Sequence, residues 1–175
     1  CIVDAFKEDL TPAPRMDMPS VHPLKPQDVE RWDEFVSACP DATFFHRAGW
    51  QTVIERALGH KTWFLYAESE GQIQGVLPMA EINSHLFGHS LSSLPFCVYG
   101  GIAAISDSAR QALDCAAQAL ASQLKVDYLE YRNLKIQHPD WPTKDLYVTF
   151  RKDIDQEIEQ NMQAIPRKQR AMVRK

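Results

Sequence analysis

The residues best suited to chemistry are cations gathered near the end of the chain, in the run "AIPRKQRAMVRK" (residues 164–175). Five of the last nine residues are basic and none is acidic; the five are Arg167, Lys168, Arg170, Arg174 and Lys175. On a helix of ~3.6 residues per turn, Arg167, Arg170 and Arg174 fall within about 60° of one another. Arginine binds phosphate through paired, charge-assisted donors. The pattern fits a diphosphate or nucleic-acid backbone site; the alternative is a solvated face, or one paired with acids of a partner domain.

The cationic run stands out because the rest of the chain is acidic. The 175 residues carry a net charge of −4, yet the first 166 hold 14 basic and 23 acidic residues, a balance of −9. No stretch approaches the roughly 20 apolar residues of a membrane span, and no signal peptide is recognisable. The four cysteines show no paired spacing, which argues against a zinc site or redox pair. These features predict a cytoplasmic protein without a metal or bound cofactor.

A second candidate is the glycine pair Gly100-Gly101, which follows the apolar stretch "LFGHSLSSLPFCVY". Glycines let backbone amides approach a ligand closely. The alternative is a buried strand followed by a tight turn. The sequence has no G-x-G-x-x-G run, no Walker loop and no Gln/Arg-x-x-Gly-x-Gly/Ala run, the usual coenzyme A pyrophosphate loop of GNAT enzymes.

Other reactive side chains have structural interpretations that we favour. His85 and His89 have a spacing that binds metal on a helix, but Gly88 lies between them in a strand-like region without a third ligand. Cys97 sits in an apolar run and is read as a core residue. Glu130 is the best lone acid for base catalysis, although a structural ion pair with Arg132 on the same strand face is the favoured interpretation.

The phrase "FFHRAGW" (residues 44–50) opens a predicted helix with His46 and Arg47. Helix starts favour anions, so these two side chains can face a ligand cleft. A solvated first turn is the equally weighted alternative.

Periodicity defines the elements that would position these residues. Residues 1–19 are read as a loose arm, and residues 21–26 as a short edge strand. Helices are predicted at 27–38, 46–58, 107–125 and 154–165, with Gly59 capping the second and Asp107 starting the third. Strands are predicted at 61–68, 72–82, one or two within 84–105, 126–133 and 145–152. The first two should form a hairpin around Ser69–Gly71.

This order predicts an α+β fold with a mixed, mainly antiparallel sheet flanked by helices. The same order of elements occurs in the GNAT acyltransferase fold, although order alone does not establish that fold.

Several segments together resemble the FemAB-like acyltransferases, specifically the bacterial group associated with exosortase/PEP-CTERM and exopolysaccharide systems. The resemblance spans roughly residues 40–175. The segments are "FFHRAGW", "GVLPMAEINSHLFGHSLSSLPFCVYGG", "LEYRN" and above all "IPRKQRAMVRK".

The resemblance implies two GNAT-like domains in tandem. Relatives of this kind transfer amino acids from aminoacyl-tRNA to peptidoglycan precursors, and hold a UDP-linked acceptor mainly with the first domain. A basic residue in the segment similar to "RKQRAMVRK" meets the diphosphate there. By resemblance, substrate binding is therefore expected of Arg170, more weakly of Arg167, Lys168 and Arg174, and of Arg47 and Trp50 at the border of the same cleft.

We accordingly expect residues 20–165 to form a first GNAT-like domain and residues 166–175 to start a basic inter-domain helix, with the second domain absent from this sequence. The expected donor is aminoacyl-tRNA or acyl-CoA, and the expected acceptor bears phosphate or saccharide. This fragment alone is expected to be inactive, and its catalytic residues are unknown. The alternative function is a non-catalytic module that binds an anionic saccharide, a nucleotide-linked ligand or RNA.

Overall fold

The computed structural model describes residues 18–84, 86, 88–144, 148–150 and 152–173. The chain divides into two compact units, Cys1–Gln137 and His138–Lys175, and each is described here by itself. The boundaries predicted for the first domain, 20–165, stay a prediction. Most of the predicted N-terminal arm lies outside the described residues.

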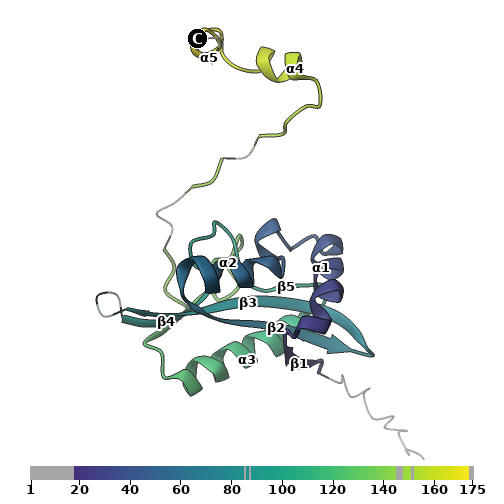
Figure 1. The fold of residues 1–175 in the computed structure, drawn as a ribbon, viewed down its shortest axis with the longest axis vertical. Helices are drawn as coiled ribbons and strands as arrows, with labels where there is room; N and C mark the ends of the chain where they lie inside the picture. The colour runs from purple at the N-terminus through teal and green to yellow at the C-terminus, as the bar shows by residue number, and fades with distance from the viewer. Residues whose placement is uncertain (1–17, 85, 87, 145–147, 151, 174–175) are drawn as a thin grey trace, which may run out of the picture. The chain divides into compact units, whose positions relative to one another are not determined.

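The first unit is built on one mixed sheet (Figure 1). Its strands run in the order β1-β2-β3-β4-β6, with the short β5 pairing β3 off this path. All pairs are antiparallel except β4 with β6, which is parallel. The strands are β1 (Ser20–Pro23), β2 (Lys61–Ser69), β3 (Gln72–Ser84), β4 (Gly88–Ser93), β5 (Ala103–Ala104) and β6 (Tyr128–Glu130).

Strands β2 and β3 form the predicted hairpin, and it is the longest pairing in the sheet. Glu70 and Gly71 connect them with φ of 51° and 74°, the double positive φ that suits a two-residue hairpin turn. The pairing continues with Leu65 opposite Leu77, and its register shifts once, between Ala67 and Glu68.

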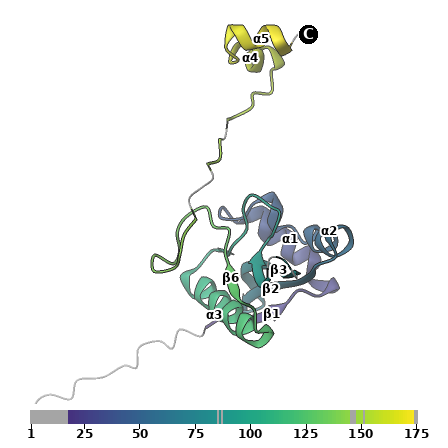
Figure 2. The ribbon, with the colours of Figure 1, turned by 90° about the vertical axis from the view of Figure 1, so that its left-hand side faces the viewer.

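Helices cover both faces of the sheet, so the central strands are buried on both sides (Figures 1 and 2). Helices α1 (Val29–Ala38) and α2 (Gly49–Leu58) lie on one face, and α3 (Asp107–Leu124) lies on the other. Phe64 and Tyr66 of β2 point to the α1/α2 core, while Leu65 and Ala67 belong to the α3 core. This is why "GVLPMA" reads as a continuous apolar run instead of a clean alternation.

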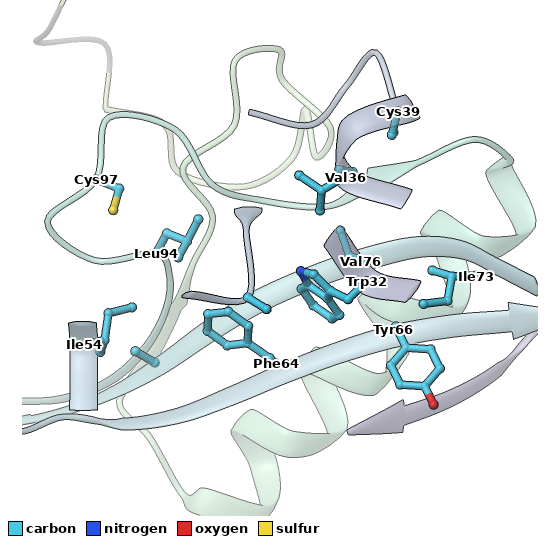
Figure 3. Close-up of a cluster of buried hydrophobic side chains, with 13 residues drawn as sticks. Trp32, Val36, Cys39, Ile54, Phe64, Tyr66, Ile73, Val76, Leu94 and Cys97 are labelled. Carbon is cyan, nitrogen blue, oxygen red and sulfur yellow. The ribbon is translucent and has the colours of Figure 1, made fainter. Parts of the chain in front are cut away.

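The α1/α2 core is centred on Trp32, which is fully buried (Figure 3). Its indole stacks on Phe64 with ring centroids 5.6 Å apart. Its Nε1 also donates a 2.7 Å hydrogen bond to the backbone oxygen of His46. Trp32 therefore joins α1 to the sheet and to the segment that leads into α2.

The predicted helix 46–58 is interrupted at its start. Residues Phe44–His46 form a short 3₁₀ turn, Arg47 has extended backbone, and α2 begins only at Gly49. The backbone N–H of Ala48 donates to the Asp33 carboxylate at 2.9 Å, which fixes the chain at this break. The predicted C-terminal cap is confirmed, since Gly59 has φ of 69°.

Helix α3 ends close to its predicted boundary but starts from a different cap. Ser106, not Asp107, is the N-cap, and its Oγ accepts a hydrogen bond from the Ala109 N–H at 3.2 Å. Ser106 has the extended backbone that an N-cap requires, whereas Asp107 is already helical. A short 3₁₀ turn, Pro26–Asp28, likewise precedes α1 where the sequence predicted helix from residue 27.

The second unit contains two short helices, α4 (Ile158–Gln163) and α5 (Arg167–Val173). The helix predicted over 154–165 is shorter because the Asn161 side chain bonds the backbone of Asp155 and Glu157 and folds a turn there. The strand predicted at 145–152 is not formed by residues 148–150 or 152, and its other residues lie outside the described part. Ile154 and Ile158 are at least 80% exposed, so the first half of the predicted stripe is left largely without packing, whereas Met162 and Ile165 are half-buried.

Across the described ranges, none of the helices has the length and apolar character needed to cross a bilayer.

The packing of Trp32 gives a stability prediction. Trp32→Phe removes the indole N–H and leaves the buried His46 carbonyl without its donor, so we expect a loss of about 2–3 kcal/mol in the free energy of unfolding. Urea denaturation measures it. Val29→Ala on the same helix is the control, because Val29 is 38% exposed and should cost well under that amount. Equal effects of the two substitutions would contradict this account of the core.

Candidate functional site

The candidate site lies where the sheet has a gap between β4 and β5. Ser93 of β4 pairs with Met79, and Ala103 of β5 pairs with Val76, both on β3. Residues 94–102 therefore leave the sheet opposite only Leu77 and Pro78; we call residues 94–102 the excursion. Pro78 has no N–H to give to a neighbouring strand, so a proline is tolerated at this gap.

The excursion begins at the carboxyl end of β4, beside the carboxyl end of the parallel strand β6. Ligands in open α/β sheets bind outside such strand ends, so this edge is the candidate location of a site. Its backbone is unusual: Leu94 and Phe96 have φ of 49° and 68°, and Gly101 has φ of 86°. Non-glycine residues in this region cost roughly 1–3 kcal/mol each and persist only where the surroundings impose them.

Arg132, just after β6, holds the first half of the excursion. Its backbone N–H donates to Ser93 Oγ at 2.8 Å, and its carbonyl accepts from the Gly100 N–H at 2.9 Å. Its guanidinium donates to the Cys97 carbonyl at 3.1 Å and to Glu130 at 2.9 Å. These bonds replace the regular ladder, so β6 ends at Glu130 where the sequence predicted strand to residue 133.

Arg110 of α3 holds the second half. Its guanidinium donates to the carbonyls of Ile102 and Ala104 at 3.1 and 3.3 Å. It also forms an ion pair with Asp41 at 2.9 Å, which ties the segment between α1 and α2 to α3. The side chain is thus committed to backbone and carboxylate partners within the fold.

His46 holds the excursion from the α2 side, and it is fully buried. Its Nδ1 accepts from the Thr43 N–H at 3.1 Å and lies 3.0 Å from Thr43 Oγ1. A ring nitrogen that accepts a backbone N–H carries no proton, so the proton is on Nε2, which donates to the Gly101 carbonyl at 3.3 Å. Burial lowers the pKa of the imidazole, and the bond to Gly101 opposes this only in part.

The glycine pair is packed against protein. A Cβ at Gly100 would lie 2.7 Å from the Ser93 carbonyl oxygen, and one at Gly101 would collide with the Asn133 side chain. The Gly100 N–H is already given to Arg132. The close approach that these glycines permit is therefore between two parts of the chain, which is the buried-turn interpretation.

The Glu130 carboxylate forms the ion pair with Arg132 that the sequence favoured, and both side chains are more than a third exposed. Opposite Glu130 in the β4–β6 register lies Ser92, which is 1% exposed. Its Oγ has no hydrogen-bond partner among the described residues. Buried hydroxyls without a partner are rare, and no signal in the sequence distinguished this serine from Ser90 or Ser93.

The two residues predicted at the start of α2 point to different surroundings. Arg47 donates to Ser37 Oγ at 3.1 Å and lines an open hollow of about 810 Å³ along α1. Trp50 is half-buried and packs against Phe44 and Phe45, with centroids 6.0 and 5.4 Å away. Phe44 is 69% exposed, so these three rings form an aromatic cluster at the surface.

The predicted cations belong to the second unit. Arg167, Lys168 and Arg170 lie on α5, with Arg170 half-buried and the other two exposed. Arg174 lies outside the described residues. The predicted helix after Pro166 is therefore present, and its Arg170 N–H donates to the Pro166 carbonyl at 3.1 Å.

His89 and Cys97, for which the sequence favoured structural roles, lie in structural surroundings. His89 Nε2 donates a hydrogen bond to the Glu81 carboxylate at 2.8 Å, while His85 lies outside the described residues. Cys97 is buried, and burial raises the pKa of its thiol. Cys39 and Cys115 are free thiols as well. Among the residues described, no cluster of three His, Cys, Asp or Glu side chains is arranged to hold a metal ion.

Comparison with known proteins gives a likeness of fold. Neither a protein-family model nor a curated protein matches the sequence. Among solved structures, the chain is similar to a ribosomal-protein-alanine N-acetyltransferase from Brucella melitensis biovar Abortus 2308. The TM-score is 0.51 at 8% identity, over 78% of this chain and 99% of that one.

Two further neighbours have similar coverage. Aminoglycoside 6'-N-acetyltransferase AAC(6')-Ig from Acinetobacter haemolyticus has a TM-score of 0.48 at 15% identity, over 78% of this chain and 99% of that one. A GNAT family acetyltransferase from Staphylococcus aureus subsp. aureus USA300_TCH1516 has a TM-score of 0.46 at 9% identity, over 79% and 98%. The predicted fold class is confirmed: this is the α+β GNAT fold, with a mostly antiparallel sheet flanked by helices.

Acyl-coenzyme A carries a diphosphate, and a helix N-terminus such as that of α3 is a place where a protein can bind one. The residues there do not fit that group. Ser106 Oγ already takes the Ala109 N–H, and the first turn carries the Asp107 carboxylate, which repels an anion. Arg110, the cation of that turn, is engaged with Asp41 and two carbonyls.

Sequence reasoning missed Thr43, Arg110 and the role of His46. Arg110 and His46 bond carbonyls of the excursion. Which carbonyls leave the sheet there is determined by strand pairing between distant segments, which the sequence does not show. Arg132 was singled out, but only as an ion-pair partner of Glu130. The odd backbone of the excursion had one visible signal, the combination of Pro95 with Gly100-Gly101.

The packing around Gly101 gives a testable prediction. Gly101→Ala combines a positive φ with a collision against Asn133, so we expect a loss of about 2 kcal/mol or more in the free energy of unfolding. Two control variants separate the causes. Gly59→Ala has a positive φ but open space, and should cost about 1 kcal/mol; Gly49→Ala has neither constraint and should be neutral or stabilising. A Gly101 variant no worse than the Gly59 variant in chemical denaturation would show that the packing is unimportant.

Proposed function

We propose that this chain is the first domain of a FemAB-type acyl or aminoacyl transferase that acts in the cytoplasm on a cell-envelope precursor or polysaccharide. The observation that carries the proposal is a GNAT fold whose α3 N-terminus is occupied by its own cap and acid. A first domain that does not hold coenzyme A is what the FemAB resemblance leads one to expect.

The reaction would be the attack of an acceptor amine or hydroxyl on an activated acyl carbonyl. A bond forms between the acceptor nitrogen or oxygen and the carbonyl carbon, the bond to the donor's leaving oxygen or sulfur breaks, and the nucleophile's proton passes to the leaving group or to solvent. Such a reaction depends on positioning and charge stabilisation more than on a covalent enzyme intermediate. We assign no catalytic residue, since Glu130 is held by Arg132.

The cations of α5 supply the part of the proposal that concerns the acceptor. A phosphate or diphosphate on the acceptor would be met by Arg170 first, with Arg167, Lys168 and Arg174 beside it. The resemblance places a second GNAT-like domain after this helix, and that domain would complete the site and contribute to holding the aminoacyl-tRNA or acyl-CoA donor. Arg47 and Trp50 stay proposed acceptor contacts of the first domain.

A direct test compares two chains for transfer from aminoacyl-tRNA or acyl-CoA to a UDP-linked muropeptide or an exopolysaccharide. A longer chain that includes the second domain should transfer the acyl group, whereas residues 1–175 should not, because half of the site is missing. Radiolabelled donor and mass analysis of the acceptor measure the product. Transfer by the 175-residue chain, or its absence from the longer one with every donor and acceptor, would contradict the proposal.

The second candidate, a binding module for an anionic saccharide, nucleotide-linked ligand or RNA, is favoured by the exposed cations of α5. The two functions can be distinguished with the same two protein chains, by measuring ligand binding beside acyl transfer. If the longer chain only binds, and Arg170→Ala weakens binding of a uridine-diphosphate sugar or RNA while lowering the salt slope by about 1, the binding module is supported. Lys152→Ala, an exposed cation of the same unit, is the matched control.

A further inference from the structure

His46 is the one side chain through which the turn before α2 and the excursion are joined by hydrogen bonds in the described structure. On one side its Nδ1 accepts the Thr43 N–H, and on the other its Nε2–H donates to the Gly101 carbonyl. Trp32 also binds the His46 carbonyl, which keeps the ring's backbone in the core. The Thr43 bond exists only for the neutral imidazole with its proton on Nε2, whereas the Gly101 bond needs a proton on Nε2 and is kept by the charged ring as long as the ring stays in place.

Protonation breaks this arrangement on one side. A proton on Nδ1 would face the Thr43 N–H, so two donors would oppose each other and the backbone amide would lose its acceptor. Thr43 Oγ1 can turn to accept the new proton, but it cannot replace the acceptor that the amide has lost. The imidazolium would also be fully buried, and a buried charge without a paired counter-ion is costly.

Among the described residues, no carboxylate forms an ion pair with the His46 ring. The charged side chains bonded to the chain around His46 and to the excursion are Asp33 of α1, Arg110 of α3 and Arg132 after β6. Asp33 accepts the Ala48 N–H, Arg110 pairs with Asp41, and Arg132 pairs with Glu130. The α1/α2 core also holds the Cys97 thiol, whose pKa is raised by burial, so it supplies no counter-charge below neutral pH.

His46 holds a turn that carries exposed aromatic side chains. The turn Phe44–His46 carries two rings of the aromatic cluster with Trp50, and Phe44 is already 69% exposed. Beyond Gly101 lies the strained backbone of the excursion, whose tip residue Phe96 is 65% exposed. Releasing the ring would free the Phe44–His46 turn without breaking a sheet pairing, while Arg132 and Arg110 keep their own bonds to the excursion.

We propose that His46 is a pH-sensitive latch: its protonation takes the Nδ1 acceptor from the Thr43 amide and drives the buried ring out of the core, so that the Phe44–His46 turn opens below neutral pH while the sheet stays folded. The direction follows from linkage. An imidazole held neutral by the closed state binds its proton more tightly in the open state, so opening becomes more favourable as pH falls below 6.5, the ordinary pKa of histidine. The latch does not depend on the acyl-transfer proposal, and it would act equally in a binding module.

Amide hydrogen exchange on the whole chain tests this directly. The Thr43 amide reports the latch, and the Leu24 amide, which donates to the Phe64 carbonyl at 2.8 Å, reports opening of the sheet. After correction for intrinsic exchange, Thr43 protection should fall by up to about tenfold from pH 7.5 to pH 5.5, the limit for one proton taken up on opening. Leu24 protection should change much less.

Two variants complete the experiment. His46→Asn offers a carboxamide oxygen near the Nδ1 position and cannot titrate, so its Thr43 protection should not depend on pH. His60→Gln removes a histidine that stacks on Phe96 instead, and should keep the wild-type dependence. The proposal is overturned if Thr43 protection is independent of pH in the wild type, if Thr43 and Leu24 fall in parallel, or if the His46 variant keeps the dependence.

Should His46→Asn fail to fold, the unmodified protein still decides the question. The ring of His46 can be titrated by nuclear magnetic resonance in the wild-type chain, together with the Thr43 amide shift. A ring that titrates below pH 6.5 in step with loss of Thr43 protection supports the latch. A ring that titrates at or above pH 6.5 would show that the closed state does not disfavour the charged form.

Discussion

Backbone carbonyls that leave a β-sheet must find other donors, and this requirement organises the candidate site. Where β4 breaks off opposite Leu77 and Pro78, the excursion turns three carbonyls, those of Cys97, Gly101 and Ile102, toward the side chains of Arg132, His46 and Arg110. Hydrogen bonds of this kind contribute about 0.5–3 kcal/mol each, depending on the donor's charge. Together they are large enough to offset about 1–3 kcal/mol of strain at each of Leu94 and Phe96. The donors come from three distant segments, so the excursion exists only in the folded unit.

Local patterns in the sequence were sufficient for most elements of this unit. The hairpin at Glu70-Gly71, the α3 stripe and the Gly59 cap follow from period and turn chemistry, and so does the GNAT-like order of strands and helices. The break before α2 did not follow, because the Asp33 carboxylate that fixes it is remote in sequence. The same holds for the site: glycines at 100 and 101 were visible, but the Asn133 side chain that fills the space beside them was not. The helix at 154–165 is shorter than predicted, because Ile154 is exposed at its start and the Asn161 side chain bonds the backbone of Asp155 and Glu157 there.

This chain has the GNAT fold, but its α3 N-terminus does not suit the diphosphate of coenzyme A. A helix N-terminus can bind an anion only while its first amides are free and no acid stands beside them. At α3 the Ser106 side chain takes the Ala109 amide, the Asp107 carboxylate stands in the first turn, and the Arg110 guanidinium is bonded to Asp41 and two carbonyls, so this end of the helix is poorly suited to an anion. If the chain takes part in acyl transfer, its contribution is therefore the positioning of an acceptor, and the cations of α5 are the groups with the chemistry for it. The chain therefore has the GNAT fold without a helix N-terminus suited to the coenzyme diphosphate.

Titration of the chain with acetyl-coenzyme A, followed by backbone amide resonances, tests whether the N-terminus of α3 binds the coenzyme diphosphate. The resonances of residues 106–110 should stay in place up to millimolar ligand, because the Asp107 carboxylate repels an anion and the Ala109 amide and the Arg110 guanidinium already have partners. Saturable shifts confined to those amides would contradict the account, since they would place the coenzyme diphosphate at the α3 N-terminus.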